Sequence, residues 1–171
     1  MSDPGLPCLG LLEATPAILR GLMVELTDED VRWKPGPDRF SVGEVLVHLS
    51  HSEGHCYRAR LDRFLSETDP VFESDQASDH LDLYARTDPE DAFDQFEEQR
   101  EANLELLRGM KASDGARTAR HHKVGPMTLA QMLHEWSLHD LGHIRQVAEI
   151  VRARKYLAGA GPLASFYDLK P

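Results

Sequence analysis

Two histidines lie four residues apart in the stretch EWSLHDLGHIRQ, residues 135–146. On a helix this spacing places the rings of His139 and His143 on one side, about 6 Å apart, where they can share one cation. A helical wheel puts both rings inside or at the edge of the apolar stripe of this segment. Because buried imidazoles need hydrogen bonds or a metal, the pair is a candidate metal site, and two core histidines with hydrogen-bonding neighbours are the alternative.

A second group of histidines, in HLSHSEGH at residues 48–55, is the best source of a third ligand. On the helix expected there, His48 flanks the apolar stripe, so its side chain can reach a cleft between helices. Glu53 falls on the inner face and is a candidate acid or base, or a group that orients a ligand histidine. Asp140, on the other helix, also points inward and could orient a ligand or simply pack between helices.

The remaining histidines and cysteines are expected to have no part in this chemistry. Cys56 is interpreted as a small buried residue, because free cysteine is commonly buried. Polar surroundings or an outward helix face predict surface positions for five histidines: His51, His80, His121, His122 and His134. The sequence contains no phosphate-binding loop, nucleophile elbow or H-E-x-x-H motif.

Four segments with helical periodicity must position these residues, and no convincing run alternates with the two-residue period of a strand. The sequence therefore predicts an all-α protein, with helices at about residues 8–26, 41–66, 88–110 and 128–154. The patterns SVGE, Asp88-Pro89 and TLAQ are typical of helix starts. The run EEQRE, in the third helix, is expected to form a solvated charged face, and the loop before the fourth could hold a short extended pair.

Composition limits the classes of function. The chain has 171 residues, 41% of them hydrophobic and 28% charged, which is typical of one globular domain spanning 1–171. Its formal net charge of -10 disfavours nucleic acid and anionic membrane surfaces as partners, and a small-molecule substrate fits better. Two cysteines, with no secretory leader and no apolar run long enough to span a membrane, lead us to expect a cytoplasmic protein.

Two long stretches, FSVGEVLVHLSHSEGHCYRAR after a tryptophan–proline loop and MTLAQMLHEWSLHDLGHIRQVAEIVR near the C-terminus, resemble the DinB-like (YfiT-like) metalloenzyme superfamily. The resemblance extends from about residue 10 to 155. It implies a four-helix bundle that runs up-down-down-up, with the long acidic segment between the second and third helices as a crossover. It also implies that His48, His139 and His143 bind one divalent metal in a cleft, with waters completing the coordination.

The resemblance also suggests an activity. Members of this superfamily include S-transferases that use bacillithiol or mycothiol, a mycothiol-dependent maleylpyruvate isomerase, and proteins assigned as hydrolases. The implied function is that of a thiol-dependent S-transferase or a hydrolase, in which the metal activates a thiol or water and Glu53 assists. Neutral imidazoles suit Zn, Ni, Fe and Cu about equally, so the sequence selects neither the metal nor the substrate, and we expect Zn or Ni. A homodimer is expected. The alternative is a non-catalytic four-helix module for metal binding or dimerisation.

Overall fold

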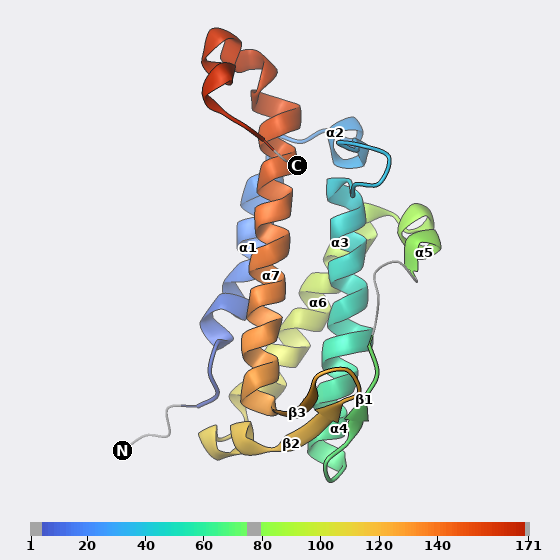
Figure 1. Cartoon of the computed structure of the whole chain (residues 1–171), viewed down its shortest axis with the longest axis vertical. Coiled ribbons are helices and arrows are strands. Elements are labelled where there is room, and N and C mark those ends of the chain that lie inside the picture. The colour runs from blue at the N-terminus through green and yellow to red at the C-terminus, as the bar shows by residue number, and fades with distance from the viewer. Residues whose placement is uncertain (1–4, 75–79, 170–171) are drawn as a thin grey trace.

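The long helices of the protein form a four-helix bundle in the computed structural model, which describes residues 5–74 and 80–169 (Figure 1). The bundle helices are α1 (Leu9–Met23), α3 (Val42–His51) with its continuation α4 (Ala59–Ser66), α6 (Pro89–Arg108) and α7 (Leu129–Val151). Side-chain caps fix three of the starts. Ser41 and Thr128 accept hydrogen bonds in capping boxes at the starts of α3 and α7, and Asp88 caps α6 with Pro89 in the first turn.

A small three-stranded sheet, which the sequence did not predict as such, lies at one end of the bundle (Figure 1). Strands β2 (Thr118–His121) and β3 (Gly125–Thr128) form the short extended pair that the loop before the fourth helix could hold. Strand β1 (Val71–Phe72) adds to β2 in parallel. Strands of two to four residues are too short to show a two-residue alternation of apolar and polar side chains, so periodicity does not reveal them.

Short helices connect or extend the main ones. Helix α2 (Asp28–Arg32) and helix α5 (Leu81–Arg86) were not predicted, and a 3₁₀ turn spans Ala112–Ala116. After α7 the chain continues through a π-helical turn at Arg152–Tyr156 and a kinked 3₁₀ segment at 158–166. Within the described residues, no helix is long and apolar enough to cross a membrane.

A π-helical segment, Ser52–Arg58, interrupts the helix that the sequence predicts over 41–66. Such a segment changes the number of residues per turn, so a wheel with 100° per residue loses its phase after residue 52. Cys56 is consequently half-buried beside a cavity, and the prediction that it is a simple core residue is wrong in this respect. Insertions of this kind often mark functional sites.

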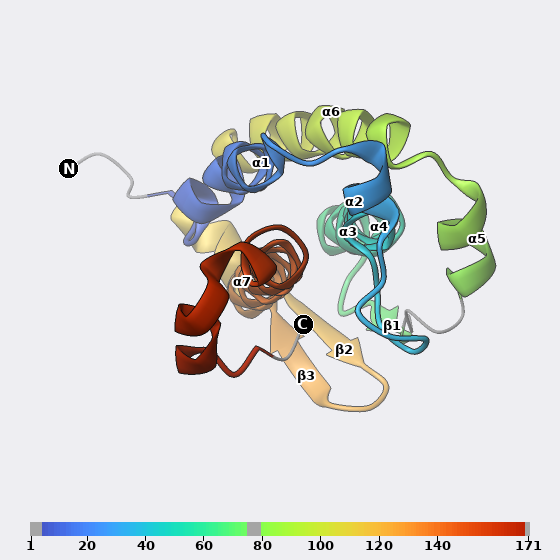
Figure 2. The ribbon, with the colours of Figure 1, turned by 90° about the horizontal axis from the view of Figure 1, so that it is seen from above.

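The arrangement of the helices leaves α3 and α7 facing each other. Helix α1 packs against α6 and α7, and α3 packs most closely against α6 (Figure 2). In Figure 1, α1 and α7 run upward and α3 and α6 run downward. The connection between α4 and α6 includes residues 75–79, which lie outside the described residues, so the long crossover stays a prediction.

Two large apolar clusters, with a small third one of Val47, Tyr84 and Ala92, form the core of the described residues. One surrounds Trp136 and Phe64 near the sheet, and the other surrounds Phe96 and Ile150 toward the opposite end. In each long helix, buried polar residues fall in sequence between the members of the two clusters, for example Asp140 between Trp136 and Val147. A buried polar layer thus separates two apolar regions.

Candidate metal centre

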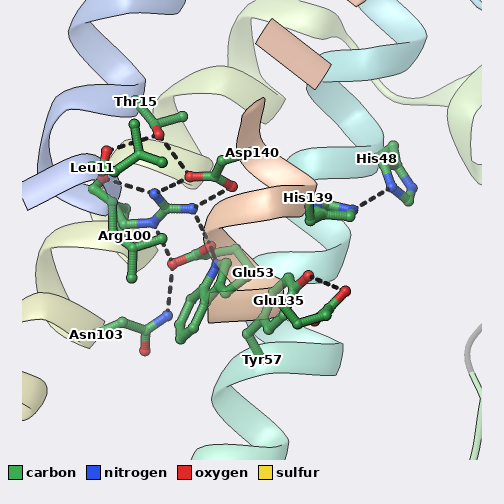
Figure 3. Close-up of polar contacts among 12 residues, drawn as sticks. Leu11, Thr15, His48, Glu53, Tyr57, Arg100, Asn103, Glu135, His139 and Asp140 are labelled. Atoms are coloured by element: carbon green, nitrogen blue, oxygen red, sulfur yellow. Dashed lines mark hydrogen bonds and ion pairs between the residues drawn. The ribbon is translucent and has the colours of Figure 1, made fainter. Parts of the chain in front are cut away.

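Three histidine rings meet between α3 and α7. His48 comes from α3, and His139 and His143 come from successive turns of α7; the nitrogen atoms that they can offer as ligands all lie within 4.8 Å of one another. The Nε2 atoms of His48 and His139 are 3.0 Å apart (Figure 3). The centroid of the His143 ring lies 4.5 Å from that of the His139 ring and 4.7 Å from that of the His48 ring. The structure therefore brings together the three residues that the resemblance indicated.

Neighbouring side chains orient two of the three rings. The Nδ1 atom of His48 lies 2.8 Å from the hydroxyl oxygen of Tyr84 in α5. The Nδ1 of His143 donates to Oε1 of Gln146 over 2.9 Å, which leaves the lone pair of its Nε2 available. Ligand histidines in metalloproteins are commonly held through the second ring nitrogen in this way. Among the described residues, the buried Nδ1 of His139 has no hydrogen-bond partner.

The environment keeps the rings of His139 and His143 neutral. Burial lowers the pKa of His139 to about 2, and the nearby charges of His143, His48 and Arg100 act in the same direction. Burial also lowers the pKa of His143, against the opposing effects of Gln146 and Asp140. A histidine binds a metal only when its ligand nitrogen is unprotonated, so the rings are in the right state at neutral pH.

The donor set fits a divalent cation. Two nitrogens bound to one metal at about 2.1 Å, with an angle of about 90–110° between them, lie about 3.0–3.4 Å apart. The 3.0 Å between the Nε2 atoms of His48 and His139 falls in this range. Three neutral imidazoles suit Zn or Ni, and a site with three protein ligands leaves coordination positions for solvent or substrate.

A cavity of about 450 Å³ opens beside the three rings. Its walls come from the π-helical segment, α3, α4, α7 and the sheet region. The lining residues are His48, Ser52, Cys56, Tyr57, Arg60, Ser74, His121, Glu135, His139 and His143. The histidine cluster is therefore accessible to a small molecule.

His121 corrects one sequence-based expectation. It was expected in a polar surface loop, but it belongs to β2 and lines the cavity. The pairing of β2 with β1 places it there, with Phe72 opposite His121 in the register. Burial lowers its pKa, and the charge of Arg60 acts in the same direction. No local pattern in the sequence could reveal this position, because it depends on a contact between strands far apart in the chain.

Glu53, the candidate acid or base, lies instead in a buried ion-pair network (Figure 3). Its carboxylate accepts two hydrogen bonds from Arg100, at 2.9 and 2.8 Å. Asn103 donates to the same carboxylate over 2.9 Å and Trp136 over 3.2 Å. Glu53 is not among the residues that line the cavity in the described part of the chain. These contacts indicate a structural role for Glu53 and not proton transfer at the histidine cluster.

Arg100 was missed, because the run EEQRE was interpreted as a solvated face. Its exposed fraction is 1%, and it also pairs with Asp140 at 2.7 Å and donates to the carbonyl of Leu12. A signal was present in the sequence: Arg100 follows Phe96 by four residues and precedes Leu107 by seven, so it continues the apolar stripe of α6. An arginine in a core stripe predicts buried carboxylate partners.

Asp140 was left open as a ligand-orienting or a packing residue, and its contacts favour packing. It accepts from Thr15 over 2.7 Å as well as from Arg100. The network thus joins α1, the π-helical segment, α6 and α7 through one guanidinium group. Asp140 directly follows His139 in the sequence. Its bonds to Arg100 and Thr15 therefore also fix the position of α7 along its axis and its rotation at the histidine cluster.

A second acidic group, Glu135, does reach the cavity. It lies one turn before His139 on α7, and the hydroxyl of Tyr57 donates to it over 3.4 Å. Tyr57 stacks on Trp136 with 4.4 Å between ring centroids, which holds the hydroxyl in place. Glu135 keeps access to solvent, but partial burial of its carboxyl raises its pKa. It is better placed than Glu53 for proton transfer near the three histidines.

The other histidines lie elsewhere. The ring of His51 stacks on that of His55 and lies tilted against that of His80, with centroids 4.4 and 4.1 Å apart. His51 and His80 are half-buried and not fully solvated as expected. His134 is exposed, as expected, and contacts Sγ of Cys8 through Nδ1 at 3.2 Å. Within the described residues, the cluster of His48 and its two partners is the one group with metal-binding geometry.

Comparisons with known proteins agree with this geometry. Residues 11–147 match the model of the family described as the DinB superfamily. A protein of Oceanobacillus iheyensis, named provisionally as a metal-dependent hydrolase, is 21% identical over 146 residues, covering 85% of this chain and 84% of the relative. The structure of YfiT from Bacillus subtilis, described as a probable metal-dependent hydrolase with an unusual four-helix bundle topology, matches with a TM-score of 0.76. It is 23% identical and the match covers 85% of this chain and 84% of YfiT, which shows a shared fold.

Proposed function

The chain belongs to the DinB superfamily, and on that basis we propose that it is a metal-dependent enzyme, a hydrolase or a thiol-dependent S-transferase. The observation that carries the proposal is the convergence of three histidines on the wall of an open cavity. A closed site with four protein ligands would favour a structural metal, whereas three ligands beside a cavity leave room for a substrate.

His48, His139 and His143 would hold the cation, with Zn or Ni as the metals that suit the donor set. A divalent cation there supplies Lewis acidity and makes a thiol or a water molecule nucleophilic near neutral pH. Tyr84 and Gln146 hold the rings of His48 and His143 for this task. Glu135 takes up or returns the proton at its carboxyl, with Tyr57 hydrogen-bonded to it. Glu53 acts at a distance, by fixing the helices that carry the ligands.

The names of two relatives support hydrolysis, and the sequence resemblance supports transfer of a thiol. The cavity contains no feature that excludes either, because both reactions need an activated nucleophile next to an electrophilic substrate. Three statements remain predictions from the sequence: that the metal is Zn or Ni, that the protein is cytoplasmic and that it forms a homodimer.

Metal content tests the proposed site. Protein purified without nickel resin should contain about one divalent ion per chain, and His139→Ala should lose most of it because one of three ligands is gone. His134→Ala is the matched control, since His134 is an exposed histidine on the same helix α7. Elemental analysis measures the metal content of the three proteins, and circular dichroism verifies that each is folded. Equal, substoichiometric metal in wild type and His139→Ala would rule out this site.

Turnover separates the enzyme from the non-catalytic module. Wild type loaded with Zn or Ni is assayed against activated esters and amides, and against electrophiles together with small thiols. We expect activity that His139→Ala loses at least a hundredfold and that Glu135→Gln lowers without loss of metal. Stoichiometric metal without any turnover across the panel would favour the metal-binding module instead.

A further inference from the structure

Two arginines of α4, one turn apart, connect this helix to the strand β1 region. Arg60 donates from Nη2 to the carbonyl of Glu73 over 2.9 Å, and Arg63 donates from Nη1 to the carbonyl of Val71 over 2.8 Å. Both guanidinium groups lie over the ring of Phe72, with 5.7 and 5.3 Å to its centroid. The two side chains therefore make equivalent contacts with the same short strand.

The two arginines differ in how their charge is compensated. Arg63 forms a bidentate ion pair with Glu67, at 2.7 and 2.9 Å. Arg60 has no carboxylate partner among the residues that the structure describes, and only one of its five N–H donors is used in a hydrogen bond there. Arg60 lines the cavity beside the histidine cluster, whereas Arg63 does not. The backbone contact and the ring of Phe72 thus hold at the cavity a guanidinium that forms no ion pair among the described residues.

The cavity wall does not share the acidic character of the chain. The formal net charge of the protein is -10, whereas the two lining residues with a formal charge at neutral pH, Arg60 and Glu135, balance each other. Burial raises the pKa of Glu135, and the charge of Arg60 acts against this shift. A divalent cation on the histidines would make the cavity positive. A pocket with this potential, in a protein that repels anions elsewhere, selects an anionic ligand.

We infer that Arg60 is a specificity residue that binds an oxyanionic group, a carboxylate or a phosphate, of the small-molecule substrate. The inference rests on the proposed function, because it concerns the substrate of the same cavity. A guanidinium presents parallel N–H donors that match the two oxygens of such a group. The substrate would then lie between Arg60 at one wall and the three histidines at the other.

Calorimetric binding of simple anions tests the inference without knowledge of the reaction. Glutarate and inorganic phosphate are the probes, and glutaramide is the neutral analogue of glutarate. Each is titrated into Zn-loaded and metal-free protein, for wild type, Arg60→Gln, Arg60→Lys and the matched control Arg63→Gln. Glutarate and phosphate separate the two oxyanions. Metal content and melting temperature are measured on the same samples.

We expect Arg60→Gln to weaken binding of the preferred anion at least tenfold, as removal of a charge-assisted hydrogen bond does. Arg60→Lys should lose less affinity, because lysine keeps the positive charge but lacks the two parallel N–H donors of the guanidinium. Arg63→Gln should change the affinity less than twofold. Glutaramide should bind weakly to all four proteins. Equal affinity in wild type and Arg60→Gln, equal losses in Arg60→Gln and Arg63→Gln, or no anion binding by wild type would each overturn the inference.

The two proposals fail in different ways. If metal is stoichiometric but anion affinity does not depend on Arg60, the inference about the substrate is wrong and the proposed metal centre is supported. If the purified protein contains no metal but its affinity for anions depends on Arg60, the proposed function is wrong and the anion site is supported. Should Arg60→Gln fold poorly, Arg60→Lys provides the same comparison with Arg63→Lys.

Discussion

Two of the three clustered histidines, His139 and His143, lie in surroundings that favour the unprotonated ring. Burial lowers the pKa of His139 from the ordinary value of 6.5 to about 2, and burial lowers that of His143 as well. The same burial that makes the rings good ligands makes their protonation costly for the folded state. In the unfolded chain both rings regain an ordinary pKa, so pH acts on stability through these residues.

Stability of the metal-free protein should therefore fall with pH below about 6.5. Between pH 6.5 and 2 the unfolded state binds the proton of His139 and the folded state does not, so the contribution is present above 6.5 and is lost as pH falls. Linkage gives a loss of about 2 kcal/mol from His139 alone between pH 6.5 and 5. Urea unfolding of chelator-treated wild type and His139→Gln from pH 7 to 5 measures it. Parallel profiles for the two proteins would contradict this assignment.

At the scale of elements, the decisive contact is the single guanidinium of Arg100. It joins Glu53 of the π-helical segment to Asp140 of α7 and to the backbone of α1 at Leu12. These ion pairs lie in the polar layer between the two apolar clusters, where no water can replace a missing partner. Removal of one partner of such a pair leaves an uncompensated buried charge.

Replacement of Arg100 by leucine should cost about 3–5 kcal/mol of unfolding free energy. The triple variant Glu53→Met, Arg100→Leu, Asp140→Leu should recover most of that loss, because it removes all three charges together. Arg108→Leu is the control on the same helix; its ion pairs with Glu13 and Glu101 are exposed and screened by solvent, so this substitution should change stability little. Urea unfolding gives the values. A loss in Arg100→Leu no larger than in Arg108→Leu would show that the network is unimportant for stability.

At the scale of the whole molecule, the fold does not depend on the proposed metal for its core. The two apolar clusters contain residues from all four long helices, and the histidine cluster lies beside them between α3 and α7. The caps of α3, α6 and α7 and the two apolar clusters do not include the three histidines. Metal binding should therefore add stability to a bundle that is already folded.

Removal of the metal should lower the melting temperature without loss of helix. A cation at a hundred times its dissociation constant adds about 2.7 kcal/mol, which corresponds to roughly 5–10 °C for a protein of this size. Circular dichroism with and without chelator measures both quantities, and His139→Ala should show no shift on chelation. Loss of the helical signal on chelation would mean that the metal organises the bundle.

Much of the candidate site could be predicted from local patterns. The S-x-x-E and T-x-x-Q boxes and the Asp-Pro start fixed where three helices begin, because these caps act within four residues of the chain. The i, i+4 pair His139 and His143 followed from helical geometry, and the family resemblance added His48. Arg100 was also visible in the stripe of α6, but its charge led to a surface interpretation.

The sequence by itself determined the mainly helical class, three helix starts and the i, i+4 pair of His139 and His143, since these depend on neighbours along the chain. Tertiary structure decided which charged residues face the cavity. Arg60 and Arg63 have the same side chain and equivalent contacts with β1, yet Glu67 compensates only Arg63. Glu53 and Glu135 were likewise separated by packing, which buried one against Arg100 and left the other at the cavity. Such differences arise from contacts between distant segments, which no periodicity in the sequence encodes.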